Sequence, residues 1–140
     1  MLLESSKSKE VQAVATTNST AQLNPLVRAL TMPEIYPHDV SPIRMVETHV
    51  SWIFFAGDYV YKVKKPVDFG FLDFTSLNRR KLFCQREVEF NRRLSPDVYL
   101  GVVEIRLQDG AYSIGGQGDV VEYAVKMRRL PDDRVLNDLL

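Results

Sequence analysis

The chain has 140 residues, of which 45% are hydrophobic and 10% aromatic, and this is enough apolar material for the core of one domain. Its 18 basic and 18 acidic side chains cancel to zero net charge, so the total charge does not favour binding to nucleic acid or to an anionic membrane. The single cysteine, Cys84, excludes an intramolecular disulfide framework and a cysteine-rich zinc site. The apolar runs are far shorter than the roughly 20 residues of a membrane-spanning helix. We therefore predict a cytoplasmic chain with no nucleic-acid or membrane partner.

The N-terminal part of the chain is predicted to contain little regular structure. Residues 1–22 are rich in Ser, Thr, Lys and Gln and contain no aromatic residue, which predicts a disordered tail or a frayed helix. Asn24 and Pro25 are the residue types preferred at a helix N-cap and at its first position, so a short helix is predicted over about 25–30. Residues 32–42 contain three prolines and are predicted to form a connector.

Strands are predicted from residue 43 onward, where β-branched and aromatic residues become frequent between turn residues. Gly57 and Asp58 predict a tight turn between two of these strands. Pro66 should end the strand before it, because proline cannot donate a hydrogen bond to a neighbouring strand. The predicted strands cover residues 43–47, 52–56, 59–65, 102–107, 111–114 and 119–130.

A long helix is predicted between these strands, over residues 77–94. Thr75 or Ser76 can cap its N-terminus, and Ser95 followed by Pro96 should end it. Adjacent strands joined by short turns imply an antiparallel sheet, which the helix can cover. The expected fold class is therefore α+β, with one long helix packed on an antiparallel sheet.

Glu87 occupies an unusual position in this helix. Phe83, Phe90 and Leu94 are spaced by seven and four residues, so they share one stripe, and Glu87 lies within it. If the stripe faces the sheet, the carboxylate is buried and needs a cation. If the helix is rotated slightly, Glu87 lies on its rim beside Arg86. The pattern leaves both arrangements open.

Three lysines in the segment YKVKK are candidate partners for a buried carboxylate. Alternate strand residues point to opposite faces, so Lys62 and Lys64 share one face and Lys65 lies on the other. We predict that Lys62 pairs with Glu87, and that Lys64 and Lys65 are solvent-facing charges on an edge strand. A buried pair adds little net stability, although removing one partner costs about 3 to 5 kcal/mol, so a function explains it better.

The sequence also resembles a known family through four segments: ETHVSW, YKVKKPVDFGFLDF, NRRLSPDVYLGVV and YAVKMRRLP, within about residues 25–140. Together they resemble the start of bacterial aminoglycoside phosphotransferase-like proteins, which are often fused to a C-terminal P-loop kinase domain. The resemblance implies a kinase-like N-terminal lobe over residues 23–130, with a five-stranded antiparallel sheet, one long helix and a short N-terminal helix. It also implies that residues 131–140 are the exit of a hinge and the start of a truncated following helix.

The resemblance implies that part of this lobe contacts the phosphates of ATP. Lys62 is similar in position to the phosphate-contacting lysine of kinase-like proteins, and Glu87 to its helix partner. The turn that contains Thr48 and Ser51 would lie over the phosphates. Their hydroxyls would then replace a glycine-rich loop, because Gly57, in the opposite turn, is the only glycine between residues 43 and 58. An ordinary connection between two strands is an equally open interpretation of this turn.

The implied hinge runs from Met127 to Pro131, and the backbone groups of Met127 and Arg129 would meet adenine. The implied cofactor is ATP with Mg²⁺, although the magnesium ligands and the catalytic aspartate belong to a second lobe and no His-Gly-Asp loop occurs in these residues. We therefore predict a nucleotide-binding lobe that is inactive alone. Its expected partners are a nucleotide and either the missing C-terminal lobe or another protein chain. The alternative is a non-catalytic remnant that acts as a protein-interaction module.

Overall fold

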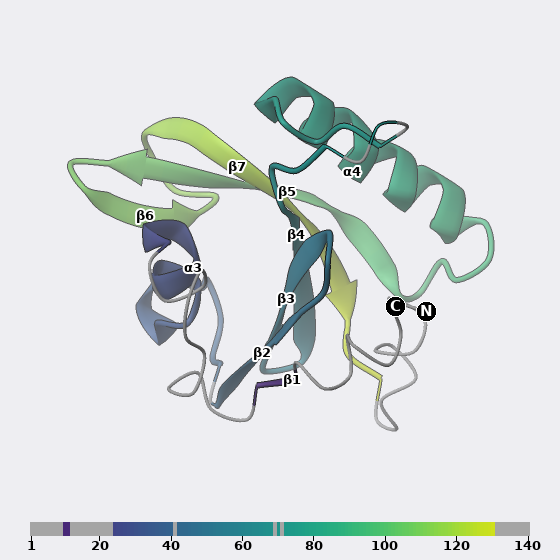
Figure 1. Cartoon of the computed structure of the whole chain (residues 1–140). Coiled ribbons are helices and arrows are strands. Elements are labelled where there is room, and N and C mark those ends of the chain that lie inside the picture. Colours follow the sequence, from purple (N-terminus) through teal and green to yellow (C-terminus); the bar gives the residue numbers. More distant parts are fainter. Residues whose placement is uncertain (1–9, 12–23, 41, 69, 71, 131–140) are drawn as a thin grey trace.

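The structure is a computed structural model that describes residues 10–11, 24–40, 42–68, 70 and 72–130 (Figure 1). Its strands are β1 (Glu10–Val11), β2 (Ile43–Glu47), β3 (Ser51–Ala56), β4 (Tyr59–Lys64), β5 (Tyr99–Gln108), β6 (Ala111–Ile114) and β7 (Asp119–Arg128). Its helical segments are α3 (Pro25–Leu30), the 3-10 turn η2 (Pro33–Ile35) and α4 (Leu77–Arg92). Apart from β1, the predicted tail over 1–22 lies outside the described residues, as does the predicted hinge exit over 131–140.

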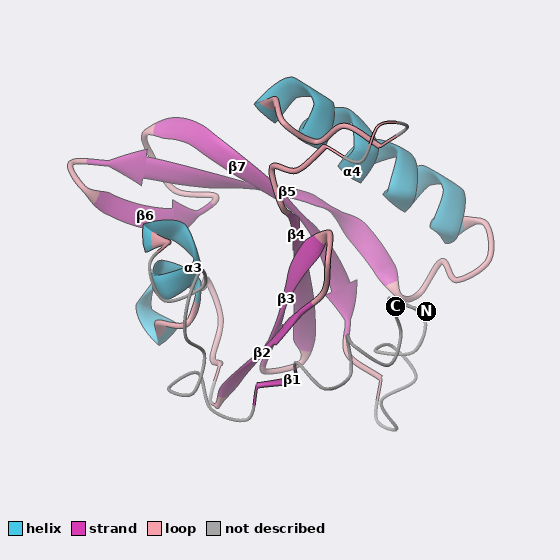
Figure 2. Cartoon of the chain, viewed as in Figure 1, coloured by secondary structure: helices cyan, strands magenta, loops and turns pink. Residues whose placement is uncertain are grey.

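The described strands form one antiparallel sheet in the order β1-β2-β3-β4-β7-β5-β6 (Figure 2). The α+β class, with one long helix and a short N-terminal helix, is confirmed. The resemblance implied five strands, and this number is wrong because the sheet has seven. The two extra strands are its edges. β1 pairs with β2, and β6 returns beside β5 after a turn in which Asp109 and Gly110 have positive φ angles of 51° and 81°.

Both faces of the central strands are covered by apolar packing. Along β3, Trp52 and Phe54 belong to a cluster that includes α3, whereas Ile53 and Phe55 belong to a second cluster that includes α4. This alternation explains why every residue of β3 is buried. Helix α3 begins as predicted, because Asn24 Oδ1 accepts hydrogen bonds from the backbone N–H groups of the next turn at 2.9 and 3.2 Å.

Helix α4 begins where the sequence predicts and ends slightly earlier. Ser76 Oγ accepts a hydrogen bond from the N–H of Arg79 at 3.1 Å, which caps the N-terminus. The helix ends at Arg92, with Arg93 as its C-cap, rather than at Leu94. The helix packs against both β5 and β7.

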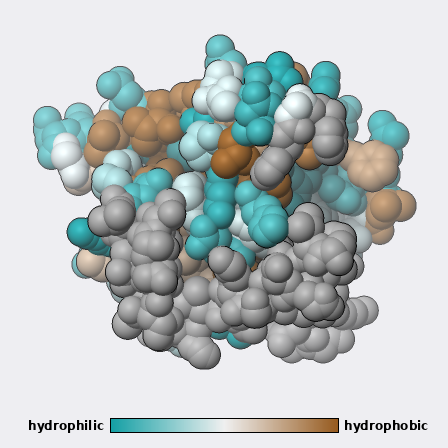
Figure 3. Space-filling view, in the orientation of Figure 1, coloured by the Kyte–Doolittle hydropathy of each residue, from teal (hydrophilic) through white to brown (hydrophobic). Residues whose placement is uncertain are grey.

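The face that α4 turns to the sheet differs from the predicted stripe. Cys84 and Val88 are buried, whereas Phe90 and Leu94 are 61% and 75% exposed, so of the two arrangements that the pattern left open the phenylalanine stripe does not face the sheet. Cys84 and Val88 pack in one cluster with Tyr99 of β5 and with Val125 and Met127 of β7. Phe83 instead packs at the side of the helix against the ring of Phe74, at 5.0 Å between centroids. Figure 3 shows hydrophobic side chains exposed at the edge of the molecule where α4 ends.

Candidate functional site

The predicted ion pair between Lys62 and Glu87 is present. Lys62 Nζ lies 3.0 Å from Glu87 Oε2, and the two side chains are 12% and 13% exposed. Lys62 comes from β4, whose neighbours in the sheet are β3 and β7, and Glu87 comes from the middle of α4. Although the stripe that contains Glu87 does not face the sheet, the Glu87 carboxylate is largely buried against Lys62.

Lys64 shares the same carboxylate, so the prediction that it faces solvent is wrong. Its Nζ lies 2.7 Å from Glu87 Oε1, and its side chain is 9% exposed. Lys65 is also held in an ion pair, with Glu47 at 2.6 Å, and its side chain is 15% exposed. Both corrections have one cause, because β4 is a central strand and not an edge. The expected alternation holds, since Lys62 and Lys64 point toward α4 and Lys65 lies over the ring of Trp52 on the other face.

Burial and charge act in opposite directions on this cluster. Burial by itself would raise the pKa of Glu87, but the ammonium groups of Lys62 and Lys64 outweigh it and hold that pKa below its ordinary value of 4.5. Burial lowers the pKa of Lys62 from its ordinary value of 10.5, and the neighbouring charge of Lys64 adds to this effect while Glu87 opposes it. The site therefore brings two lysine amines against one carboxylate.

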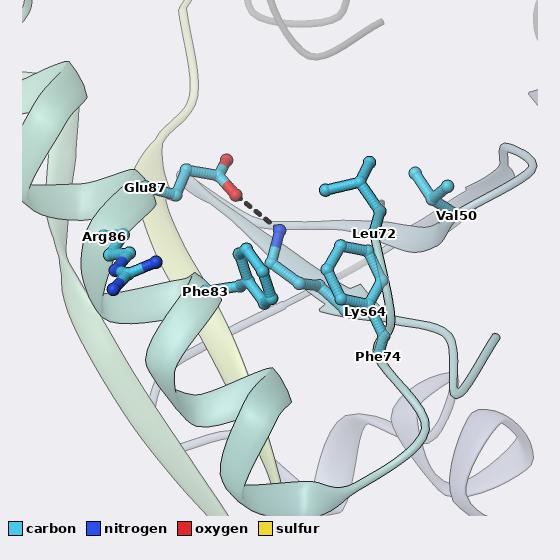
Figure 4. Close-up of a pocket in the computed structure, with 7 residues that line it drawn as sticks. All are labelled: Val50, Lys64, Leu72, Phe74, Phe83, Arg86 and Glu87. Carbon is cyan, nitrogen blue, oxygen red and sulfur yellow. Dashed lines mark hydrogen bonds and ion pairs between the residues drawn. The ribbon is translucent and has the colours of Figure 1, made fainter. Parts of the chain in front are cut away.

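A cavity of about 460 Å³ opens beside this ion cluster (Figure 4). Its wall combines charged groups with apolar side chains from the β2–β3 turn, the segment before α4, and α4 itself. The lining residues are Val50, Lys64, Leu72, Phe74, Phe83, Arg86 and Glu87. The sequence patterns did not single out most of these residues as site residues, since their proximity depends on how α4 lies over the end of β4.

The predicted phosphate turn is a tight connection whose hydroxyls face the protein. Thr48 Oγ1 accepts hydrogen bonds from the N–H groups of Val50 and Ser51 at 3.3 and 3.0 Å, so it stabilises its own turn. Thr48 is 8% exposed and Ser51 is fully buried. Within the described residues the Ser51 hydroxyl makes no hydrogen bond. The part of the turn that reaches the cavity is the side chain of Val50.

The predicted hinge residues Met127 and Arg129 make contacts within the sheet and its core. Met127 is fully buried in the cluster beneath α4, and it pairs with Val60 on one side and Tyr99 on the other. The backbone N–H of Arg129 donates to the carbonyl of Asp58 at 2.8 Å, so it is already engaged. The structure does not bring Met127 or Arg129 to the cavity beside Glu87.

A second buried ion pair was missed from the sequence. Arg80 Nε lies 3.0 Å from both carboxylate oxygens of Glu122, and Arg80 Nη1 donates to the carbonyls of Phe74 and Thr75 at 2.8 and 3.1 Å. This guanidinium therefore joins α4, β7 and the segment that leads into α4. Burial raises the pKa of Glu122 even though Arg80 opposes the shift. The available signal was Glu122 within the otherwise apolar strand segment VVEYAV.

The described residues contain neither a metal cluster nor a membrane-spanning helix. Among these residues no group of three or more His, Cys, Asp or Glu side chains could hold a metal ion. None of the described helices has the length and apolar character required to cross a membrane.

Comparisons with known proteins give relatives without a stated activity. Uncharacterized proteins of Mycobacterium tuberculosis and Mycobacterium bovis are 35% identical to this chain over 94 residues, which cover 67% of this chain and 17% of each relative. The aligned part of the chain thus spans 17% of the length of these relatives. No protein-family model matches the chain, and no solved structure matches it.

Proposed function

We propose that this chain is the nucleotide-binding lobe of an ATP-dependent small-molecule phosphotransferase of the kinase-like, aminoglycoside phosphotransferase-like type. The supporting observation is the contact of 3.0 Å between Lys62 and Glu87. Lys62 lies on β4, the third strand counted from β2 and the last of the four described strands that precede α4, and Glu87 lies on that helix. In protein kinases a lysine on the third strand is paired with a helix glutamate in the same order, and that lysine contacts the phosphates of ATP.

The proposal assigns binding to this lobe and chemistry to another part of the protein. ATP with Mg²⁺ is the proposed cofactor, and the lysine cluster supplies positive charge for its phosphates. The catalytic aspartate and the magnesium ligands would come from a second lobe. The length of the mycobacterial relatives, of which the aligned part is 17%, leaves room for such a lobe in those proteins.

A binding titration of the chain with MgATP tests the proposal. We expect saturable binding, seen as shifts of backbone NMR signals around β4 and α4, and at least about tenfold weaker binding for Lys62→Met because the cluster beside the phosphates loses one positive charge. Lys65→Met is the matched control, since Lys65 lies on the other face of the same strand and pairs with Glu47. Absence of saturable binding, or an unchanged affinity of Lys62→Met, would show that the proposal is wrong.

A second candidate function is a protein-interaction module without catalysis. The observation that favours it is the exposure of Phe90 and Leu94, 61% and 75%, at the end of α4. Size-exclusion chromatography with light scattering separates the two functions. An oligomer that binds no ATP and becomes monomeric in the double variant Phe90→Ser, Leu94→Ser favours the module. A monomer that binds MgATP favours the nucleotide-binding lobe.

A further inference from the structure

The ion cluster at α4 has more positive than negative charge. The single carboxylate of Glu87 faces two ammonium groups, with its two oxygens 3.0 Å from Lys62 Nζ and 2.7 Å from Lys64 Nζ. Arg86, on the next residue of the helix, adds a guanidinium to the wall of the same cavity. The chain as a whole has zero net charge, so this excess is local. A local positive excess with little solvent around it attracts an anion more strongly than an exposed lysine does.

The lysine on the cavity wall is Lys64, and Lys62 is not among the lining residues. Figure 4 shows the ammonium of Lys64 directed at the Glu87 carboxylate, close to the rings of Phe74 and Phe83. An ammonium group carries three N–H donors, and the described residues receive one hydrogen bond from Lys64. Of the two lysines that contact Glu87, Lys64 is therefore the one that an anion in the cavity can reach.

We infer that this cavity is an anion-binding subsite in which Lys64 contacts a phosphate group of the ligand directly, while Glu87 holds Lys62 behind it. The inference deepens the proposed function and rests on it, because the phosphate group is assigned to the nucleotide. The remaining wall is apolar, with Val50, Leu72 and the two phenylalanine rings, so the subsite suits a phosphate attached to a larger body. When the anion binds, the ion pair between Lys64 and Glu87 weakens as Lys64 donates to the phosphate oxygens. The ion pair between Glu87 and Lys62 remains.

Calorimetric titrations with MgATP and with inorganic tripolyphosphate test the subsite. We expect Lys64→Met to bind both ligands at least about tenfold more weakly, and Lys64→Arg to stay within about threefold of the parent chain because it keeps a charged donor. Lys65→Met is the unaffected control. Similar affinities for the two ligands mean that the subsite binds phosphate alone, and a tighter MgATP means that the nucleoside adds contacts. Both results support the inference.

Glu87→Gln separates a ligand role of Lys64 from a structural one. If Glu87 competes with the anion for Lys64, this variant binds tripolyphosphate about threefold or more tightly than the parent chain. If Lys64 only supports the helix, the variant gains no affinity. Near-ultraviolet circular dichroism of each variant checks that its core is intact, and Lys64→Arg preserves the test if Lys64→Met does not fold.

The outcomes distinguish this inference from the proposed function. Weaker MgATP binding in Lys62→Met with unchanged binding in Lys64→Met overturns the subsite and leaves the proposed function standing. Tripolyphosphate binding that depends on Lys64, without MgATP binding, supports the subsite and overturns the proposed function. If neither ligand binds, both are wrong.

Discussion

Replacing Glu87 by alanine should strongly destabilise the fold. The variant leaves two ammonium groups, on side chains that are 12% and 9% exposed, without the carboxylate that both contact. Breaking one buried ion pair in this way costs about 3 to 5 kcal/mol. For a domain of this size each kcal/mol lowers the melting temperature by about 4 °C or more, so we expect a fall of at least about 12 °C.

The loss should depend on pH in a direction that the pKa shifts determine. Because the pKa of Glu87 is lowered in the folded state, its stabilising contribution is present above its ordinary pKa of 4.5 and disappears as pH falls through the lowered value. The lowered pKa of Lys62 acts in the same direction in a higher pH range: stability rises with pH from that lowered value up to 10.5, since the folded chain releases the proton first. Without Glu87, Lys62 loses its proton at still lower pH. The deficit of the variant should therefore shrink as pH falls through the lowered pKa of Glu87.

Urea denaturation at several pH values measures this deficit. Fluorescence of Trp52, which is 3% exposed, and far-ultraviolet circular dichroism should report one transition. Glu89→Ala is the matched control, because Glu89 is an exposed glutamate on the same helix and should change stability by less than about 0.5 kcal/mol. A loss for Glu87→Ala below about 1 kcal/mol at neutral pH, the range of surface pairs, or a deficit that does not shrink in acid, would refute the reasoning.

Three further variants or reactions test other parts of the structure. Arg80→Met leaves the buried carboxylate of Glu122 unpaired and should cost about 3 to 5 kcal/mol in urea denaturation; a loss like that of an exposed arginine contradicts the pair. Cys84 is fully buried, and burial raises the pKa of its thiol to about 11. The folded chain should therefore react with a thiol reagent far more slowly than the urea-unfolded chain, and equal rates would contradict this. Gly57→Ala should lower the free energy of unfolding more than Gly110→Ala. Both glycines have positive φ, 65° and 81°, but of the two only Gly57 would place a Cβ against a backbone oxygen, at 2.5 Å. Equal losses in urea denaturation would contradict the clash.

The parts of the fold that the sequence predicted well are set by nearby residues. The turn at Gly57 and Asp58 joins β3 and β4, whose predicted bounds differ from the observed ones by one residue. Ser76 caps α4 at the predicted position. The pairing of Lys62 with Glu87 was also predictable from nearby residues. Strand alternation indicates which face of the strand Lys62 lies on, helix periodicity indicates the stripe that contains Glu87, and the strand and the helix follow each other in the chain.

The parts that were mispredicted depend on contacts between distant segments. Lys64 was assigned to an edge strand, but β7, which starts at residue 119, pairs with β4 and makes it central. The contact between Arg80 and Glu122 joins residues 42 positions apart, which no local pattern indicates. The helix pattern could not settle which face meets the sheet, because Phe90 and Leu94 are apolar yet exposed, and apolar character alone does not place a side chain in a core.

The shared carboxylate of Glu87 is difficult to explain by stability alone. A buried ion pair seldom offsets the loss of hydration of its two charges, and the pKa of Lys62 is lowered mainly by burial and further by the like charge of Lys64. An apolar residue in place of Lys64 would remove that repulsion and would suit a wall that already contains Phe74 and Phe83. The second lysine is therefore better explained by an anion that completes the cluster, since the anion supplies the negative charge that Glu87 cannot provide for both lysines. An interaction module that uses the exposed end of α4 has no need of this arrangement, and for this reason the charges at Glu87 favour phosphate binding as the function of this lobe.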